Sequence, residues 1–142
     1  MIATLLICAS LTAVDGDTVK CDGQNLRLLG EGVPFLSGID TPEIGSHAKC
    51  MKERKLALLA KGRLKEILAE KSLTIEFYGV RDKTPSHRPL VNIYRNDGSE
   101  VGQTLLKEGF AREWHPDRRN DWCDLRSGGA TLLLDTGDNR RS

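Results

Sequence analysis

The sequence predicts a mixed α+β domain, mainly β, in which a five-stranded barrel carries one main helix after the third strand and a short second helix. Five stretches have the β-branched and apolar composition of strands, namely residues 4–14, 19–21, 25–29, 73–78 and 89–94. Between residues 47 and 71 the apolar positions recur every three or four residues, as in an amphipathic helix. This order of elements is typical of an OB-type barrel.

Turn residues delimit these strands. Asp15-Gly16-Asp17-Thr18 and Asp22-Gly23 separate the first three stretches, which we therefore expect to be consecutive antiparallel strands. Asn96-Asp97-Gly98 gives a hairpin-type turn signal after the last stretch. A short helix is expected over residues 101–108, with Gly109 where a C-terminal cap belongs.

The chain has 142 residues, which favours a single domain, and its 39% hydrophobic and 29% charged residues are ordinary for a globular protein. We expect this domain over residues 1–123 and a loosely ordered tail over residues 124–142, where regular patterning fades. We also expect a monomer. No membrane span is expected, since the apolar run at the N-terminus is short of the roughly 20 residues that a membrane helix needs.

The net charge of +1 conceals an asymmetry along the chain. Residues 1–46 hold two basic and six acidic side chains, a balance of −4, whereas the remainder carries +5. This division suits a cation site beside a polyanion better than nonspecific binding of nucleic acid by a uniformly basic surface.

The four cysteines, at positions 8, 21, 50 and 123, form no Cys-x-x-Cys pair, which argues against a zinc ribbon. A distorted zinc site from His47, Cys50, His115 and Cys123 is one alternative. A Cys50–Cys123 disulfide is expected if the protein is exported, and buried free thiols if it is not. The sequence leaves the compartment open, with the cytoplasm slightly favoured over secretion or the periplasm, because no basic residue precedes the N-terminal apolar run.

Two acidic turns provide candidate metal ligands. Asp17 follows the first strand and Asp40 follows the third, and the backbone carbonyl of Thr41 adds a third oxygen. Calcium and magnesium take oxygen ligands, and water can fill the remaining positions of a calcium shell. The candidate metal ligands are therefore Asp17, Asp40 and Thr41.

Three further residues supply the other requirements of phosphodiester hydrolysis. Glu43, three residues after Asp40 and behind the stiff Pro42, is placed to act on a water as general base or orienter. Arg27 and Arg88 are candidates to grip phosphate oxygens. Each acidic motif alone is more often structural, as a turn or loop signal. It is the occurrence of both, with the two arginines, that indicates hydrolysis.

These motifs together resemble the staphylococcal nuclease (thermonuclease) family. The resemblance spans about residues 10–114 and rests on five stretches, which are 14–19, 26–30, 39–43, 82–90 and 102–111. It implies an OB barrel, one calcium ion held by Asp17, Asp40 and the Thr41 carbonyl, and a water that Glu43 orients or deprotonates. It also implies that Arg27 and Arg88 bind and polarise the phosphate, and that DNA and RNA are cleaved at the 5′ P–O bond to leave 3′-phosphate ends.

Two features depart from this family pattern. Roughly eight extra residues separate Arg27 from Asp40, so the segment Glu31–Gly38 must bulge out if the two are to keep their relative placement. The closing helix of the family has no evident counterpart, and residues 114–123 take its place. Trp114 and Trp122 there, and Tyr94, are candidates to stack on a base, although tail anchoring for the tryptophans and core packing for Tyr94 are the simpler interpretations.

The leading interpretation is thus a calcium-dependent nuclease that hydrolyses phosphodiester bonds of DNA, RNA or both. The alternative is a catalytically inactive OB-fold module that binds nucleic acid or a protein. A third possibility is a small-ligand or disulfide-stabilised binding domain in which Asp17 and Asp40 are only turn residues.

Overall fold

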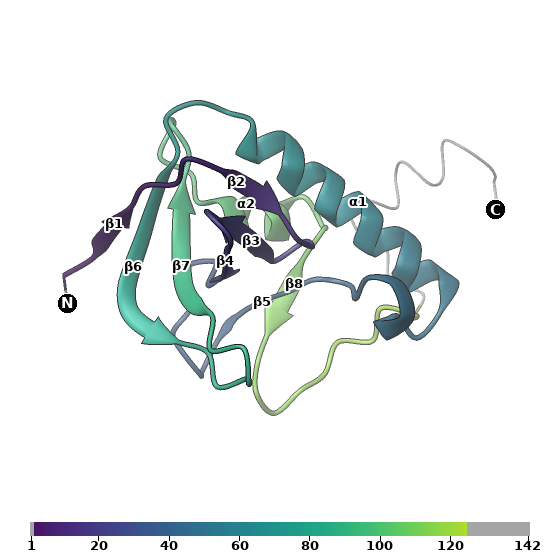
Figure 1. The fold of residues 1–142 in the computed structure, drawn as a ribbon. Helices are drawn as coiled ribbons and strands as arrows, with labels where there is room; N and C mark the ends of the chain where they lie inside the picture. The colour runs from purple at the N-terminus through teal and green to yellow at the C-terminus, as the bar shows by residue number, and fades with distance from the viewer. Residues whose placement is uncertain (1, 125–142) are drawn as a thin grey trace.

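The computed structural model describes residues 2–124 of the chain, so most of the expected tail lies outside the described residues. A curled six-stranded sheet is accompanied by a two-stranded ribbon and two α-helices (Figure 1). The strands are β1 (Thr4–Leu6), β2 (Leu11–Ala13), β3 (Thr18–Cys21), β4 (Gln24–Leu28), β5 (Gly38–Asp40), β6 (Thr74–Arg81), β7 (Pro89–Tyr94) and β8 (Arg112–Trp114). The helices are the 3₁₀ turn η1 (Gly45–His47), α1 (Met51–Leu68) and α2 (Val101–Lys107).

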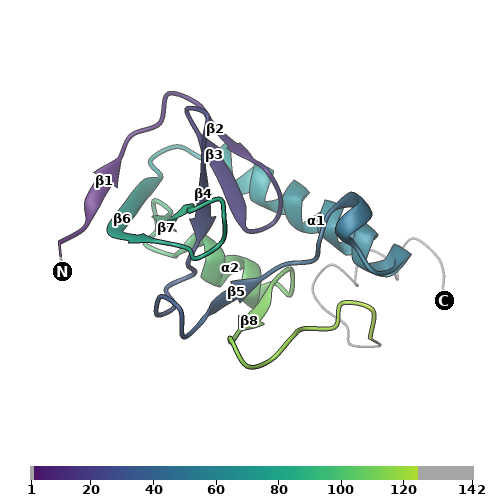
Figure 2. The same cartoon turned by 60° about the horizontal axis from the view of Figure 1, so that its bottom comes forward.

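The strands of the main sheet follow the order β1-β6-β7-β4-β3-β2. All neighbours pair antiparallel except β4 and β7, which pair in parallel and place Arg27 opposite Leu90. β5 and β8 form a separate antiparallel ribbon with Gly38 opposite Trp114. Figure 2 shows this ribbon beside the curled sheet, with the chain continuing from β5 toward the start of α1. The α+β class, and the place of the main helix after the third predicted strand, are confirmed.

The strand count differs from the prediction, because the described residues form eight strands where the sequence indicated five. The run from Thr4 to Val14 is divided: β1 pairs with β6 and β2 pairs with β3. At the break, the Asp22 carboxylate accepts hydrogen bonds from the backbone N–H groups of Ala9 and Ser10. The ribbon strands β5 and β8 have three residues each, which is too short for an alternating pattern to be recognised.

One hydrophobic core joins the sheet to both helices. It contains Val19, Leu26, Leu28, Ile39, Leu64, Ile67, Ile75, Val91, Ile93, Val101, Leu105 and Ala111. Because α1 and α2 both contribute to it, burial of their apolar faces fixes these helices against the barrel. Gly109 follows α2 with φ +84°, the left-handed conformation expected of a C-terminal glycine cap. No helix among the described residues is long and apolar enough to cross a membrane.

All four cysteines are paired, Cys8 with Cys21 and Cys50 with Cys123. The first bond links the segment between β1 and β2 to the end of β3 and is not among the pairings expected from the sequence. The second links the residue before α1 to the C-terminal segment of the described chain. It also consumes two of the four ligands of the alternative zinc site, which rules that alternative out.

Candidate active site

The two acidic turns pack against each other. Gly16 lies between Asp15 and Asp17, and a Cβ atom added there would come within 2.9 Å of the Thr41 Cβ. Thr41 is also buried, at 3% exposure, and is one of the neighbours that lower the pKa of Asp17. The structure therefore places the turn before β3 directly against the turn after β5. The absence of a side chain at Gly16 is what permits this close approach.

Asp17 is buried and paired with an arginine. It is 6% exposed and forms an ion pair with Nη1 of Arg27. Burial raises the pKa of Asp17, but the Arg27 guanidinium and hydrogen bonds from neighbouring side chains outweigh that effect and hold the pKa below its ordinary value. Asp17 is therefore ionised at neutral pH. Burial and the charge of Asp17 together raise the pKa of Asp15 to about 7.

Asp40 is held by the C-terminal segment of the described chain, a contact that no local sequence pattern indicates. Its Oδ2 accepts hydrogen bonds from Nδ2 of Asn120 at 3.1 Å and from Nε1 of Trp122 at 3.2 Å. Burial raises the pKa of Asp40 and these two hydrogen bonds partly offset the rise. Trp122 is 6% exposed and packs under the Arg112 guanidinium at 4.1 Å, so its expected anchoring role matches its position.

Glu43 lies in the loop after β5, near the other two carboxylates. Burial raises its pKa, and the charges of Asp17 and Asp40 raise it further. Its backbone N–H donates to Oε2 of the buried Glu53 at 2.9 Å, and the backbone N–H of Lys49 donates to Oε1 at the same distance. Glu53, on the first turn of α1, therefore fixes both ends of the loop that carries Glu43. No local pattern around Glu53 indicates this role.

The segment Glu31–Gly38 does bulge out without separating Arg27 from the second acidic turn. Nη2 of Arg27 donates to the carbonyl oxygen of Ile39 at 2.7 Å, directly before Asp40. The guanidinium thus bridges the two acidic turns through Asp17 and Ile39.

Arg88 is positioned by two polar partners. Its Nε donates to Oδ2 of Asp82 at 2.7 Å, and its Nη1 donates to Oγ1 of Thr18 at 2.9 Å. Thr18 follows Asp17 in the chain, so this contact brings Arg88 beside the first acidic turn. Arg27 and Arg88 line one groove of about 430 Å³ together with Asp40 and Glu43.

The oxygen atoms at the two acidic turns are of the chemical type that binds a hard cation. Asp17 and Asp40 supply carboxylates and Thr41 a backbone carbonyl, which are ligands that calcium accepts. Both hydrogen bonds to Asp40 reach Oδ2, which leaves Oδ1 as a possible ligand atom. Among residues 2–124, no three or more acidic, histidine or cysteine side chains converge as a complete cage. Water would have to complete a shell built on these residues.

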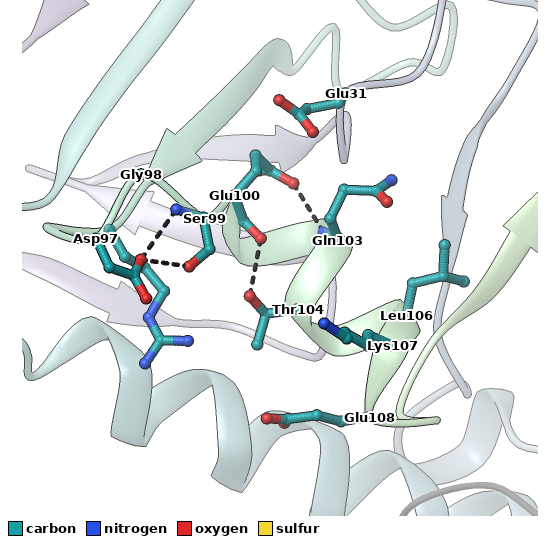
Figure 3. A pocket seen from close by; sticks show the side chains of 11 residues that line it. Glu31, Asp97, Gly98, Ser99, Glu100, Gln103, Thr104, Leu106, Lys107 and Glu108 are labelled. Carbon is teal, nitrogen blue, oxygen red and sulfur yellow. Dashed lines mark hydrogen bonds between the residues drawn. The ribbon is translucent and has the colours of Figure 1, made fainter.

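A second hollow, of about 830 Å³, contains none of the predicted site residues (Figure 3). Much of its polar lining is occupied by local hydrogen bonds. The Glu100 side chain caps α2 through the Gln103 N–H at 2.8 Å, the Thr104 hydroxyl donates to the Glu100 carbonyl, and Ser99 donates to Asp97. We interpret this hollow as part of the turn and cap that join β7 to α2.

Asp82 should make the folded state sensitive to acid. Burial raises the pKa of Asp82, but hydrogen bonds from Arg88 and Thr84 outweigh it and hold the pKa below its ordinary value of 3.8. A depressed folded-state pKa contributes stability that is present above the unfolded value and lost as pH falls through the folded value. We therefore expect Asp82→Ala to lower the free energy of unfolding by about 1–3 kcal/mol at neutral pH.

Urea unfolding of both proteins at a series of pH values measures this effect. The gap between wild type and Asp82→Ala should be constant above about pH 5 and should shrink below about pH 4. A gap that stays the same down to about pH 2 would contradict the assigned role of the Asp82 carboxylate.

Comparison with known proteins identifies the family. The family model described as staphylococcal nuclease homologue matches residues 35–125, which is more than half of the chain and includes Asp40, Thr41, Glu43 and Arg88. Asp17 and Arg27 precede the matched region, and the fold brings them to it. A search of curated proteins gives no significant match. The curled sheet with its two helices agrees with the OB fold of the matched family. The chain belongs to the staphylococcal nuclease family.

Proposed function

We propose that this protein is a calcium-dependent nuclease that hydrolyses phosphodiester bonds of DNA, RNA or both. Membership of the family indicates a nuclease-like or nucleic-acid-binding domain. The observation that carries the finer proposal is that Arg27, Arg88, Asp40 and Glu43 line a single groove. Two arginine side chains suited to bind phosphate, and Glu43 as a candidate base, can thus contact the same substrate molecule.

In this mechanism the two arginines hold the phosphate. Arg27 and Arg88 are each fixed by hydrogen bonds, so they present preorganised donors to the oxygens of a phosphodiester. Both still have further N–H groups, because a guanidinium has five. A calcium ion held by Asp17, Asp40 and the Thr41 carbonyl would supply additional positive charge at the phosphate.

Glu43 accepts a proton from the attacking water. Its carboxylate lines the groove beside the two arginines, and its loop is held by Glu53. The water oxygen forms a bond to phosphorus while the bond from phosphorus to the 5′ oxygen breaks. The phosphate remains on the 3′ oxygen of one product, and the departing 5′ oxygen takes a proton from solvent.

A catalytically inactive binding module is the second candidate, and the contacts already made by the two aspartates favour it. Arg27 already neutralises Asp17 through a direct ion pair, and the Asp40 carboxylate already accepts two hydrogen bonds. In that case the carboxylates would only hold the two turns together. The arginines would still bind phosphate without hydrolysis.

A cleavage assay distinguishes the two candidates. Plasmid DNA and single-stranded RNA are incubated with wild type in calcium, in magnesium or in chelator, beside Arg88→Ala. The matched control is Arg63→Ala, which removes an arginine paired with Glu108 outside the groove. We expect calcium-dependent cleavage that falls about a hundred-fold or more in Arg88→Ala and is unchanged in Arg63→Ala. Inactive wild type under every condition would leave the binding module as the better account.

The two disulfides indicate the cellular compartment in which the protein works. The sequence alone slightly favours the cytoplasm. Disulfides persist in secreted and periplasmic proteins and are rare in the reducing cytosol. The pairs Cys8–Cys21 and Cys50–Cys123 therefore support a protein that works in an oxidising compartment.

A further inference from the structure

We propose that Phe35 is a nucleobase platform at the groove, so that one nucleotide of a single strand lies with its phosphate on the arginines and a base on this ring. The inference rests on the proposed function for its class of ligand, a nucleic acid, and adds the residue that would favour single strands. The ring belongs to the segment Glu31–Gly38, which joins β4 to β5.

The lining of the groove is divided between charged and apolar side chains. Arg27, Arg88, Asp40 and Glu43 are among the charged ones, and the aromatic rings of Phe35 and Trp114 are among the apolar ones. Gly38 is opposite Trp114 in the β5–β8 ribbon and has no side chain to cover the indole. A nucleotide has the same division, with a charged phosphate and a flat base that stacks on aromatic rings.

Core packing does not explain the position of Phe35. Its side chain is 39% exposed, although phenylalanine is among the residues most often buried. Its backbone has φ +68°, an unfavourable conformation for a bulky side chain. Such strained positions persist where the surrounding structure imposes them, and they cluster at ligand-binding sites.

Hydrogen bonds hold the segment that imposes this position. The backbone N–H of Glu31 donates to Oδ1 of Asn92 on β7 at 2.8 Å. The backbone N–H of Val33 donates to Oγ of Ser37, and the N–H of Ser37 donates to the carbonyl of Val33, both at 2.9 Å. The segment is therefore closed on itself and tied to the barrel, which makes Phe35 a preorganised surface.

Lys83 connects this ring to the arginine side of the groove. Its ammonium lies 4.4 Å from the centroid of the Phe35 ring, and it comes from the same loop as Arg88, between β6 and β7. An exposed cation–π contact is weak, so a base can displace the ammonium from the ring. The displaced charge would then be available to an adjacent phosphate. Because a base must leave the duplex stack to reach Phe35, the arrangement favours single strands.

The test measures the binding of two fluorescent probes in the absence of metal. Fluorescence anisotropy in the presence of a chelator gives the affinity for each probe. One probe is a short thymidine oligonucleotide, and the other is an abasic strand with the same number of phosphates. Phe35→Ala should weaken binding of the thymidine strand by roughly ten-fold and leave binding of the abasic strand unchanged. Phe35→Trp should retain wild-type binding.

The matched control is Leu36→Ala, which truncates an apolar side chain of the same segment. Leu36 is 65% exposed and does not line the groove, so its removal should change neither affinity. The salt dependence of binding should be the same for wild type and Phe35→Ala, because no charge is removed, and shallower for Lys83→Gln.

The outcomes separate this inference from the proposed function. Equal thymidine affinities for wild type, Phe35→Ala and Leu36→Ala would overturn the platform even if the protein cleaves nucleic acid. Equal losses for both probes in Phe35→Ala would overturn it as well, since a base contact cannot affect an abasic strand. Base-dependent binding through Phe35 in a protein that never cleaves would support the platform and contradict the nuclease.

Discussion

Asp40→Asn is expected to lower phosphodiesterase activity about a hundred-fold or more without unfolding the protein. The substitution removes one of the two carboxylates proposed to hold calcium. It keeps a carbonyl oxygen where Oδ2 now accepts hydrogen bonds from Asn120 and Trp122, so the C-terminal segment stays in place. Initial cleavage rates at saturating calcium, with the thermal unfolding midpoint of each protein, measure both effects.

Asn120→Ala serves as the control for this substitution. It removes one hydrogen bond to Asp40 and keeps the carboxylate, so a moderate loss of rate with calcium dependence preserved is expected. Asp40→Asn activity close to that of wild type would show that Asp40 holds the two turns together and does not take part in hydrolysis.

Loss of the Cys50–Cys123 bond is expected to give the largest change in stability. The bond closes a loop with a sequence separation of 73, for which chain entropy predicts a loss of about 4 kcal/mol in the free energy of unfolding. That is a large part of the roughly 5–15 kcal/mol of a typical domain. The double variant Cys50→Ser/Cys123→Ser is suitable, because serine at position 50 can still cap α1, as the Cys50 sulfur does through the Glu53 N–H.

The same variant should also lose activity, since Cys123 follows Trp122, which donates to Asp40. The control is Cys8→Ser/Cys21→Ser, which opens a loop of separation 13 and whose two cysteines do not line the groove. Its expected loss is smaller, about 3 kcal/mol, with the cleavage rate of the folded protein unchanged. Urea unfolding and single-time-point cleavage of both variants suffice. Equal effects of the two pairs on the cleavage rate would argue against a link between the Cys50–Cys123 bond and the site.

The sequence was sufficient to predict the features that depend on local pattern. The four- and three-residue spacing of Ala60, Leu64 and Ile67 predicts the main helix, and α1 is observed over Met51–Leu68. The acidic turns around Asp17 and Asp40 were identified from residue type and order, and the fold packs them together at Gly16 and Thr41.

Features that depend on contacts between distant residues could not be predicted. The β5–β8 ribbon consists of three-residue strands whose pairing has no local signal. The hydrogen bond from Trp122 to Asp40 joins residues 82 positions apart, and the sequence around Trp122 does not indicate which residue accepts it. The sequence likewise indicates that Arg27 contacts substrate but not that it forms an ion pair with Asp17. That pair depends on the register of β3 and β4, in which Thr18 lies opposite Arg27.

The initial rate of cleavage of an end-labelled single strand, measured as free calcium is raised from a chelated baseline, tests the central claim most directly. The proposed nuclease predicts a saturable rise for wild type, a flat response for Asp40→Asn, and products that end in 3′-phosphate. A wild-type rate that is the same in chelator as in calcium would contradict it.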